Sequence, residues 1–228
     1  IQNPKFVLII DEINRGNRSK IFGELIYGLE YRDTPIKTQY SEFDDNPSFL
    51  KIPKNLLIIG TMNTADRSIS LFDTALRRRF AFIELLPDYD LLVKQFEISE
   101  DYVFEEVLKK LESDKNNVRI LSVLSLDILN QEILNNIQLG REKQIGHSYL
   151  IPLASDQSKF YNIWRYEIIP LLEEFYYAES ETLENILGKN IFDKNYGIQD
   201  FERDELIVNL TKLVKHSNGW INYITRKR

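Results

Sequence analysis

The segment Phe6-Val-Leu-Ile-Ile-Asp-Glu-Ile-Asn-Arg15 joins a run of apolar residues to a pair of carboxylates. Its first five residues, Phe6–Ile10, are all apolar and three are β-branched, which is typical of a short strand buried on both faces in a parallel sheet. Two carboxylates, Asp11 and Glu12, follow where the strand would leave the sheet, and such strand ends line the ligand crevice. An Asp that holds Mg²⁺ beside a Glu that polarises water is the acidic half of a phosphate-hydrolysing site. The alternative is a strand that runs into a helix N-cap, where Asp is also favoured.

Composition restricts the class of protein. The 228 residues are 43% hydrophobic and 28% charged, which is ordinary for a globular protein of one large or two small domains. The net charge of −6 argues against a nucleic-acid-binding surface that dominates the whole chain. The absence of cysteine excludes disulfides and fits a reducing, cytoplasmic environment. Because no apolar run approaches the ~20 residues of a membrane span, we expect no membrane partner.

Three further segments of the first part of the chain have recognisable patterns. Asn55–Gly60 is a second apolar run that predicts a buried strand, and it leads into Thr61–Ser68. Phe80–Leu86 alternates aromatic and aliphatic residues and predicts a third strand, closed by Pro87. The charged, turn-rich sequence of Tyr31–Pro53 predicts a projecting hairpin or a long loop.

After Pro87 the strand patterns mostly fade and helical periodicity prevails. Helices are predicted in five segments: Leu91–Phe96, Val103–Leu111, Ile120–Ile137, Phe160–Tyr177 and Leu206–Val214. Pro170 is expected to split or kink the fourth of these, and Gly188 to end a further short helix. We therefore expect an α/β portion in residues 1–88 and a helical portion in residues 89–228.

Four motifs, taken in order, resemble the McrB branch of the AAA+ superfamily, the motor subunits of modification-dependent restriction systems. They are a Walker B-like strand in Phe6–Arg15, a signature-like Gly60–Arg67, an arginine-finger-like Asp73–Phe80 and a lid-like Ile145–Tyr149. The resemblance covers roughly residues 1–170. It implies a partial AAA+ (P-loop NTPase) α/β core with a parallel sheet, followed by an α-helical lid.

The resemblance also implies a role for each matching residue. Asp11 matches the aspartate that reaches Mg²⁺ through water, and Glu12 matches the catalytic glutamate that orients or deprotonates the attacking water. Asn63 lies at the sensor-1 position beside the γ-phosphate, although Asn also commonly stabilises loops. Asn14 and Asp66 match nucleotide-site or signature positions, and Asp66 is alternatively an ordinary turn carboxylate.

Three consecutive arginines, Arg77–Arg79, end a short predicted helix. Positive charge at a helix C-terminus is favourable by ~0.3–1 kcal/mol, but three adjacent guanidinium groups repel one another. In the family that the chain resembles, arginines here reach the nucleotide of the neighbouring subunit. We expect Arg78 to be this finger, with Arg79 next. His147 is expected to be a structural hydrogen-bonding residue rather than a catalyst.

The sequence lacks the phosphate-binding motif of the family, Gly-x-x-x-x-Gly-Lys-Ser/Thr. Its one Gly-Lys pair, Gly188-Lys189, is followed by Asn190 and has no glycine at the required spacing. In the family the P-loop strand lies between the sensor-1 strand and the last strand, so a gap is expected between the second and third strands here. The chain also lacks an initiator Met, and we expect it to be a fragment that is inactive alone.

For the complete protein, the resemblance implies hydrolysis of GTP or ATP with Mg²⁺ to drive DNA translocation. It further implies a homo-oligomeric ring, expected to be a hexamer, a McrC-like nuclease subunit, and DNA contacts through an N-terminal domain absent from this sequence. Two other classes stay open: an inert AAA+ scaffold, and a regulatory fragment that docks onto a motor ring. The intact Asp11, Glu12, Asn63 and Arg78 argue against a decayed site.

Overall fold

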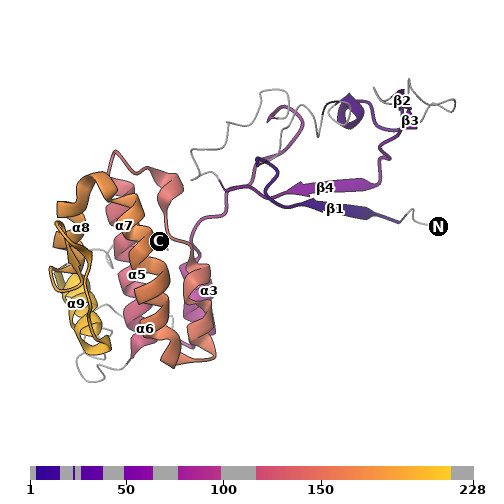
Figure 1. Cartoon of the computed structure of the whole chain (residues 1–228). Coiled ribbons are helices and arrows are strands. Elements are labelled where there is room, and N and C mark those ends of the chain that lie inside the picture. The colour runs from indigo at the N-terminus through magenta and orange to yellow at the C-terminus, as the bar shows by residue number, and fades with distance from the viewer. Residues whose placement is uncertain are drawn as a thin grey trace. The chain divides into compact units, whose positions relative to one another are not determined.

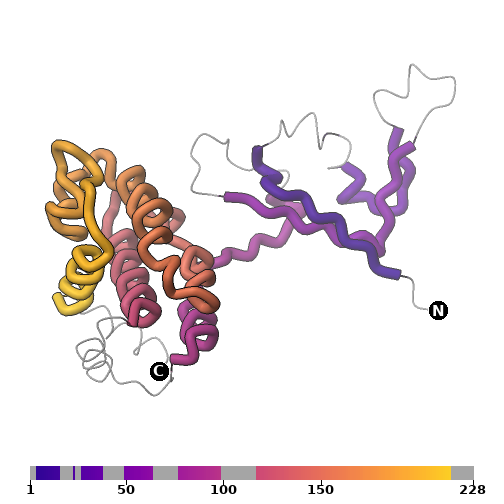
Figure 2. Tube along the Cα trace, turned by 60° about the horizontal axis from the view of Figure 1, so that its bottom comes forward, coloured from indigo at the N-terminus to yellow at the C-terminus, as the bar shows by residue number. Residues whose placement is uncertain are grey.

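The computed structural model describes residues 4–15, 23, 27–37, 49–63, 77–98 and 117–216. The chain divides into two compact units, Ile1–Glu84 and Leu85–Arg228 (Figures 1 and 2). In the described part, the first unit contains the strands β1 to β4, and the second contains helices and a small β-hairpin. This is the predicted order of an α/β portion followed by a helical portion.

The first unit is built on two parallel strands, β1 (Phe6–Ile10) and β4 (Leu56–Gly60), which lie side by side in Figure 1. Their register pairs Phe6 with Leu56 and Ile10 with Gly60. Both strands were predicted, and both form because runs of β-branched and aliphatic residues favour extended backbone.

The burial predicted for these strands is wrong. Phe6 is 55% exposed and Ile9 is 67% exposed, and Leu57 on β4 is 56% exposed. Inner strands of parallel sheets are buried by helices on both faces and by further strands. In the described part of the chain, β1 and β4 chiefly contact each other, so both faces stay accessible.

The prediction of a third strand at Phe80–Leu86 is also wrong. Residues 81–88 have no regular secondary structure, and Ile83 and Leu85 are highly exposed. An alternating pattern gives a strand only where a neighbour supplies the ladder of hydrogen bonds. Among the described residues no strand pairs with this segment. The gap expected between the second and third strands therefore stays a prediction.

The hairpin predicted between Tyr31 and Pro53 is confirmed at its base. Strand β2 (Ile36–Lys37) pairs antiparallel with β3 (Phe49–Leu50). The tip, residues 38–48, lies outside the described residues.

Helix α5 (Val118–Asn135) is the centre of the second unit, close to the predicted 120–137. Asn117 caps its start, because its side-chain oxygen accepts the N–H of Ile120 at 3.4 Å. Most of its residues are buried around the whole circumference, as in a helix inside a domain core. It contacts α3 and α9, and Figure 1 shows it between them.

The other elements of this unit surround α5. The helices are α3 (Tyr89–Gln95), α6 (Phe160–Ile163), α7 (Ile169–Phe175), α8 (Ser180–Leu187) and α9 (Arg203–His216), and the hairpin strands are β5 (Phe192–Asp193) and β6 (Gly197–Ile198). Short 3₁₀ turns are η2 (Arg141–Lys143), η3 (His147–Ala154), η4 (Gln157–Lys159) and η6 (Tyr177–Glu179), and η5 (Trp164–Ile168) is a π-helical segment. The helix predicted at Val103–Leu111 lies outside the described residues. No helix in the described ranges is long and apolar enough to cross a bilayer.

The predicted 160–177 helix continues through Pro170, but a π-helical segment interrupts it just before the proline. Helix α6 passes through the π segment Trp164–Ile168 into α7, where Pro170 occupies the first turn. Proline has no N–H to give to the carbonyl of Tyr166, and its ring crowds that carbonyl. A wider π turn directly before the proline accommodates both effects.

Gly188 ends α8, as predicted, with a φ of 86°, a backbone conformation that favours glycine. A Cβ at this position would lie 2.8 Å from Nδ2 of Asn209. The following Lys189 places its Nζ 3.6 Å from Oδ2 of Asp193. The Gly188-Lys189 pair therefore belongs to a helix end and a hairpin, and not to a phosphate-binding loop.

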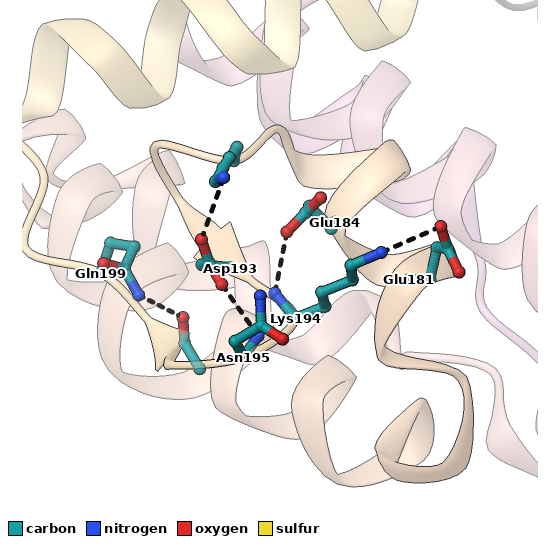
Figure 3. A network of polar contacts seen from close by, with 8 residues as sticks. Glu181, Glu184, Asp193, Lys194, Asn195 and Gln199 are labelled. Carbon is teal, nitrogen blue, oxygen red and sulfur yellow. Dashed lines mark hydrogen bonds and ion pairs between the residues drawn. The ribbon is translucent and has the colours of Figure 1, made fainter.

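The β5–β6 hairpin is fastened to α8 by polar contacts (Figure 3). The backbone N–H of Lys194 donates to Oε2 of Glu184 at 2.8 Å, and its Nζ lies 3.1 Å from Oε1 of Glu181, which raises the pKa of the lysine. The backbone N–H of Asn195 donates to Oδ1 of Asp193 at 2.8 Å, and this bond lowers the pKa of Asp193. These charges have partners in the hairpin itself or on α8, so the network is structural.

The buried amide of Asn130 on α5 holds the chain at Ile145. Its Oδ1 accepts the N–H of Ile145 at 2.7 Å, and its Nδ2 donates to the carbonyl of Ile145 at 2.9 Å and to Oη of Tyr89 at 2.8 Å. All three residues are buried. One side chain therefore satisfies both backbone groups of a residue that no helix or strand pairs.

We expect Asn130→Ala to lower the free energy of unfolding by more than about 2 kcal/mol, because each buried polar group left unsatisfied costs ~1–3 kcal/mol. Chemical denaturation of the chain, followed by the fluorescence of the buried Trp164, measures this. Asn135→Ala, at an exposed position of the same helix, is the matched control and should stay within ~0.5 kcal/mol of the parent. Equal stabilities for the two variants would refute the importance of the Asn130 contacts.

Candidate functional site

The parallel register brings the ends of β1 and β4 to one edge of the strand pair. Pairing continues past both strands: the N–H of Thr61 donates to the carbonyl of Ile10 at 3.0 Å, and the N–H of Ile13 donates to the carbonyl of Thr61 at 2.9 Å. Asp11 and Glu12 therefore lie beside Thr61, at the carboxyl ends of the strands, where ligands of α/β sheets bind.

The hydroxyl of Thr61 joins the two acidic residues. Its Oγ1 accepts the backbone N–H of Glu12 at 3.1 Å and donates to Oδ1 of Asp11. A hydroxyl can do both because it carries one donor and two acceptor positions. Glu12 has a φ of 51°, which is uncommon for a residue other than glycine, and the bond to Thr61 holds it there.

The carboxylate of Glu12 faces Arg15. Nε of Arg15 lies 3.3 Å from Oε2 of Glu12, within the range of an ion pair but without the geometry of a hydrogen bond. Oε2 is shielded from solvent and accepts no hydrogen bond from the described residues. The positive charge of Arg15 thus orients the predicted catalytic carboxylate, and Oε2 can still accept a hydrogen bond.

The side chain of Asn14 connects the two strand ends a second time. Its Nδ2 donates to the backbone carbonyl of Asn63 at 3.1 Å. Asn14 is only 8% exposed, and its Oδ1 is buried without a hydrogen-bond partner among the described residues. Two predicted site residues that lie 49 positions apart in the sequence are therefore brought together, with Asn14 holding the backbone of Asn63.

Ile13 packs over the last residue of β4. A Cβ on Gly60 would lie 2.9 Å from Cδ1 and 3.1 Å from Cγ2 of Ile13. Ile13 is 5% exposed, whereas most of the side chains on β1 and β4 are accessible. The absence of a side chain at Gly60 therefore lets the chain after β1 close over the end of β4.

The three arginines have three different environments. The guanidinium of Arg77 lies over the ring of Phe82, 5.4 Å from its centroid. Arg79 forms a hydrogen-bonded ion pair with Glu30. Arg78 is exposed and has no ion-pair or hydrogen-bond partner among the described residues.

The donor set at the strand ends suits Mg²⁺. No group of three or more His, Cys, Asp or Glu side chains in the described ranges is arranged to hold a metal ion. Mg²⁺ in phosphate-transfer sites needs no such cage, because it is bound by one or two carboxylates, water and phosphate oxygens. Asp11 fits this role: Thr61 occupies Oδ1, and Oδ2 makes no hydrogen bond with the described residues. Asp66, the remaining signature residue, lies outside the described residues.

His147, in the lid-like segment, has the structural role that the sequence predicts. Its Nδ1 accepts the backbone N–H of Asp88 at 2.9 Å. Asp88 in turn caps α3, since its Oδ1 accepts the N–H of Leu91 at 3.0 Å. The imidazole therefore fixes the start of α3 within the second unit.

Two partners of the predicted site residues were not predicted from the sequence. Thr61 directly follows the second apolar run, as Asp11 follows the first, and that equivalence of position was an available indication. Glu30, the partner of Arg79, had no indication in the sequence, because the pair joins residues 49 positions apart.

Comparison with known proteins gives two family matches. Residues 2–80 match the AAA domain of the dynein-related subfamily, and residues 122–184 match the alpha-helical lid domain of McrB. The matches fall on the strand pair with its strand ends and on the helical unit, respectively.

Two relatives are informative. The chain is 37% identical over 198 residues to the Type IV methyl-directed restriction enzyme EcoKMcrB subunit of Escherichia coli (strain K12). The aligned region covers 81% of this chain and 40% of that relative. The chain is 33% identical over 109 residues to the Type II restriction enzyme BsuMI component YdiS of Bacillus subtilis (strain 168), covering 42% of this chain and 32% of that protein. The chain thus spans less than half the length of either relative.

Gly60→Ala should push Ile13 off the strand end, since a contact of 2.9 Å is too short for a real Cβ. We expect faster amide hydrogen exchange at Ile13 and Thr61, measured by mass spectrometry on the chain. Gly23→Ala is the matched control, because nothing lies within 4 Å of a Cβ there and Ala is favoured over Gly in a helix. Unchanged exchange in Gly60→Ala would show that Ile13 does not depend on this close approach.

Proposed function

Since the chain belongs to the McrB-type AAA+ proteins, we propose that it forms the water-activating part of a nucleoside triphosphatase, followed by its helical lid. The observation that carries the proposal is the meeting of Asp11, Glu12 and the Asn14–Asn63 contact at one edge of the β1–β4 pair. Residues 1–88 would supply the Walker B, sensor-1 and arginine-finger positions, and residues 89–228 the lid.

Each residue has a separate task in this proposal. Asp11 would hold Mg²⁺, and the ion would offset charge on the phosphate oxygens. Glu12 accepts a proton from a water molecule as the water oxygen attacks the γ-phosphorus and the bond to the β–γ bridging oxygen breaks. Asn63 orients that water or the γ-phosphate, and Asn14 keeps the backbone of Asn63 in place. Asp66 acts near the same water or on a partner.

Arg78 is proposed as the finger that reaches the nucleotide of a neighbouring subunit. Arg77 and Arg79 each have a contact within their own chain, with Phe82 and Glu30 respectively. Arg78 is the exposed member of the three without a described partner, so its guanidinium is available to another subunit. Arg79, the second candidate for the finger, is paired with Glu30 in its own chain.

The activity of the complete protein is part of the same proposal. Both relatives are named as restriction enzymes or their components, so we place this chain in a restriction system that acts on DNA. We propose that a homo-oligomeric ring hydrolyses GTP or ATP in the cytoplasm and drives DNA translocation together with a McrC-like nuclease subunit. A P-loop from outside this sequence would bind the phosphates.

The chain by itself should bind nucleotide weakly or not at all. These 228 residues contain no Gly-x-x-x-x-Gly-Lys-Ser/Thr motif, so we expect calorimetry to detect weak or no binding of GTP or ATP. Joining the chain to a P-loop segment should restore binding. Low-micromolar affinity for the chain alone would contradict this division of the site and would favour a regulatory or otherwise different nucleotide-binding role.

In the complete protein, Glu12→Gln should keep nucleotide binding and assembly but stop turnover, because an amide cannot take the proton from water. Steady-state phosphate release and nucleotide affinity are measured on the same preparation. Glu174→Gln, at an exposed position of the lid, is the control for the loss of one negative charge. A Glu12→Gln protein that hydrolyses at the parental rate would exclude Glu12 as the base.

Arg78→Ala should lower the rate far more than the loss of a surface charge, since arginine fingers contribute ~10³–10⁵ in well-studied systems. Arg77→Ala is the neighbouring control. Rings that mix Arg78→Ala subunits with Glu12→Gln subunits should regain hydrolysis, because some interfaces then pair an intact Glu12 with an intact Arg78. Mixed rings that assemble normally but stay as inactive as either parent would show that Arg78 does not act in trans.

A further inference from the structure

The hydroxyl of Thr61 forms hydrogen bonds with both Asp11 and Glu12 at the edge of the strand pair. It accepts the N–H of Glu12 at 3.1 Å and donates to Oδ1 of Asp11, while the backbone of Thr61 bonds to Ile10, the last residue of β1, and to Ile13 just beyond it. Thr61 therefore contacts both acidic residues, but it is neither the proposed metal ligand nor the proposed base. Its chain position, two residues before Asn63, links the two carboxylates to the sensor-1 segment.

The two bonds place different demands on the residue. Orienting Asp11 needs a hydrogen-bond donor, because an ionised carboxylate only accepts. Holding the N–H of Glu12 needs an acceptor, and this N–H belongs to a residue with a φ of 51°, outside the usual range for a side-chain-bearing residue. Among short side chains that fit at a strand end, a hydroxyl meets both demands with one atom.

We propose that Thr61 is a positioning residue that aligns Asp11 with Glu12 at the end of the strand pair. The proposal rests on the function proposed above for this site. The donated bond fixes Oδ1 of Asp11 and directs Oδ2 away from Thr61, toward the side where a hydrated Mg²⁺ would be bound. The accepted bond fixes the backbone from which the Glu12 carboxylate projects. A shift of the sensor-1 segment would therefore move both carboxylates together.

The structural part of the proposal is tested on the chain as it stands. Thr61→Val keeps the shape of the side chain but removes the hydroxyl, and Thr61→Ser keeps the hydroxyl. Amide hydrogen exchange at Glu12, followed by NMR, should accelerate about tenfold or more in Thr61→Val and stay near the parental rate in Thr61→Ser. Thr211→Val, which removes a lid hydroxyl bonded to the carbonyl of Ile207, is the matched control and should leave Glu12 unchanged.

The functional part is tested in the complete protein. Removing an outer partner of a metal-site carboxylate typically costs 10–100-fold in activity or metal affinity. We expect Thr61→Val to lower kcat by that factor and to raise the Mg²⁺ concentration needed for half-maximal rate, with KM for the nucleotide little changed. Thr61→Ser should recover most of both. If Thr61→Val does not fold, as judged by thermal unfolding, Thr61→Ala replaces it, because alanine also lacks the hydroxyl.

Several outcomes overturn the assignment. A Thr61→Val protein with parental Glu12 exchange would show that the hydroxyl does not hold this backbone. Parental kcat and Mg²⁺ dependence in Thr61→Val, or equal losses in Thr61→Val and Thr61→Ser, would show that the hydroxyl does not position the catalytic groups. An unmodified complete protein that hydrolyses neither GTP nor ATP is a different result, because it refutes the proposed function itself.

Discussion

The parallel pairing of β1 with β4 is the interaction on which the candidate site depends. Its register sets Ile10 against Gly60, so that the residues after both strands meet at one edge. A slip of one residue would send alternate side chains to the opposite face and separate Asp11 from Thr61. Three contacts lock the register beyond the strands: the backbone bonds of Thr61, the packing of Ile13 on Gly60, and the bond from Asn14 to Asn63.

The two units differ in how completely they bury their apolar residues. The second unit has a continuous core around α5 that includes the fully buried Trp164, Tyr176 and Phe160. The strand pair of the first unit instead exposes large aliphatic and aromatic side chains on both faces. Contiguous apolar surface of this kind mostly marks a site of contact with another surface. The β1–β4 pair thus presents an apolar surface suited to such a contact.

Local sequence patterns predicted the strands, the helices and the position of the carboxylates at a strand end. Both apolar runs form strands, and the carboxylates lie at a strand end. The lid helices within the described residues lie within a few residues of their predicted positions, with Gly188 as a stop. The errors concern non-local partners: the burial of β1 and β4, and a third strand without a neighbour in the described part of the chain. The bonds of Thr61 join residues 49 and 50 positions apart, so they follow only from the register.

A cryo-EM structure of the complete protein with Mg²⁺ and a non-hydrolysable GTP or ATP analogue would show whether the β1–β4 edge is the hydrolytic site. We expect the γ-phosphate to lie at this edge, with Glu12 and Asn63 within about 2.6–3.2 Å of one water molecule. We also expect the neighbouring subunit to contribute Arg78 to the same nucleotide. A γ-phosphate bound away from this edge, or a Glu12 carboxylate directed away from the nucleotide, would show that this edge is not the hydrolytic site.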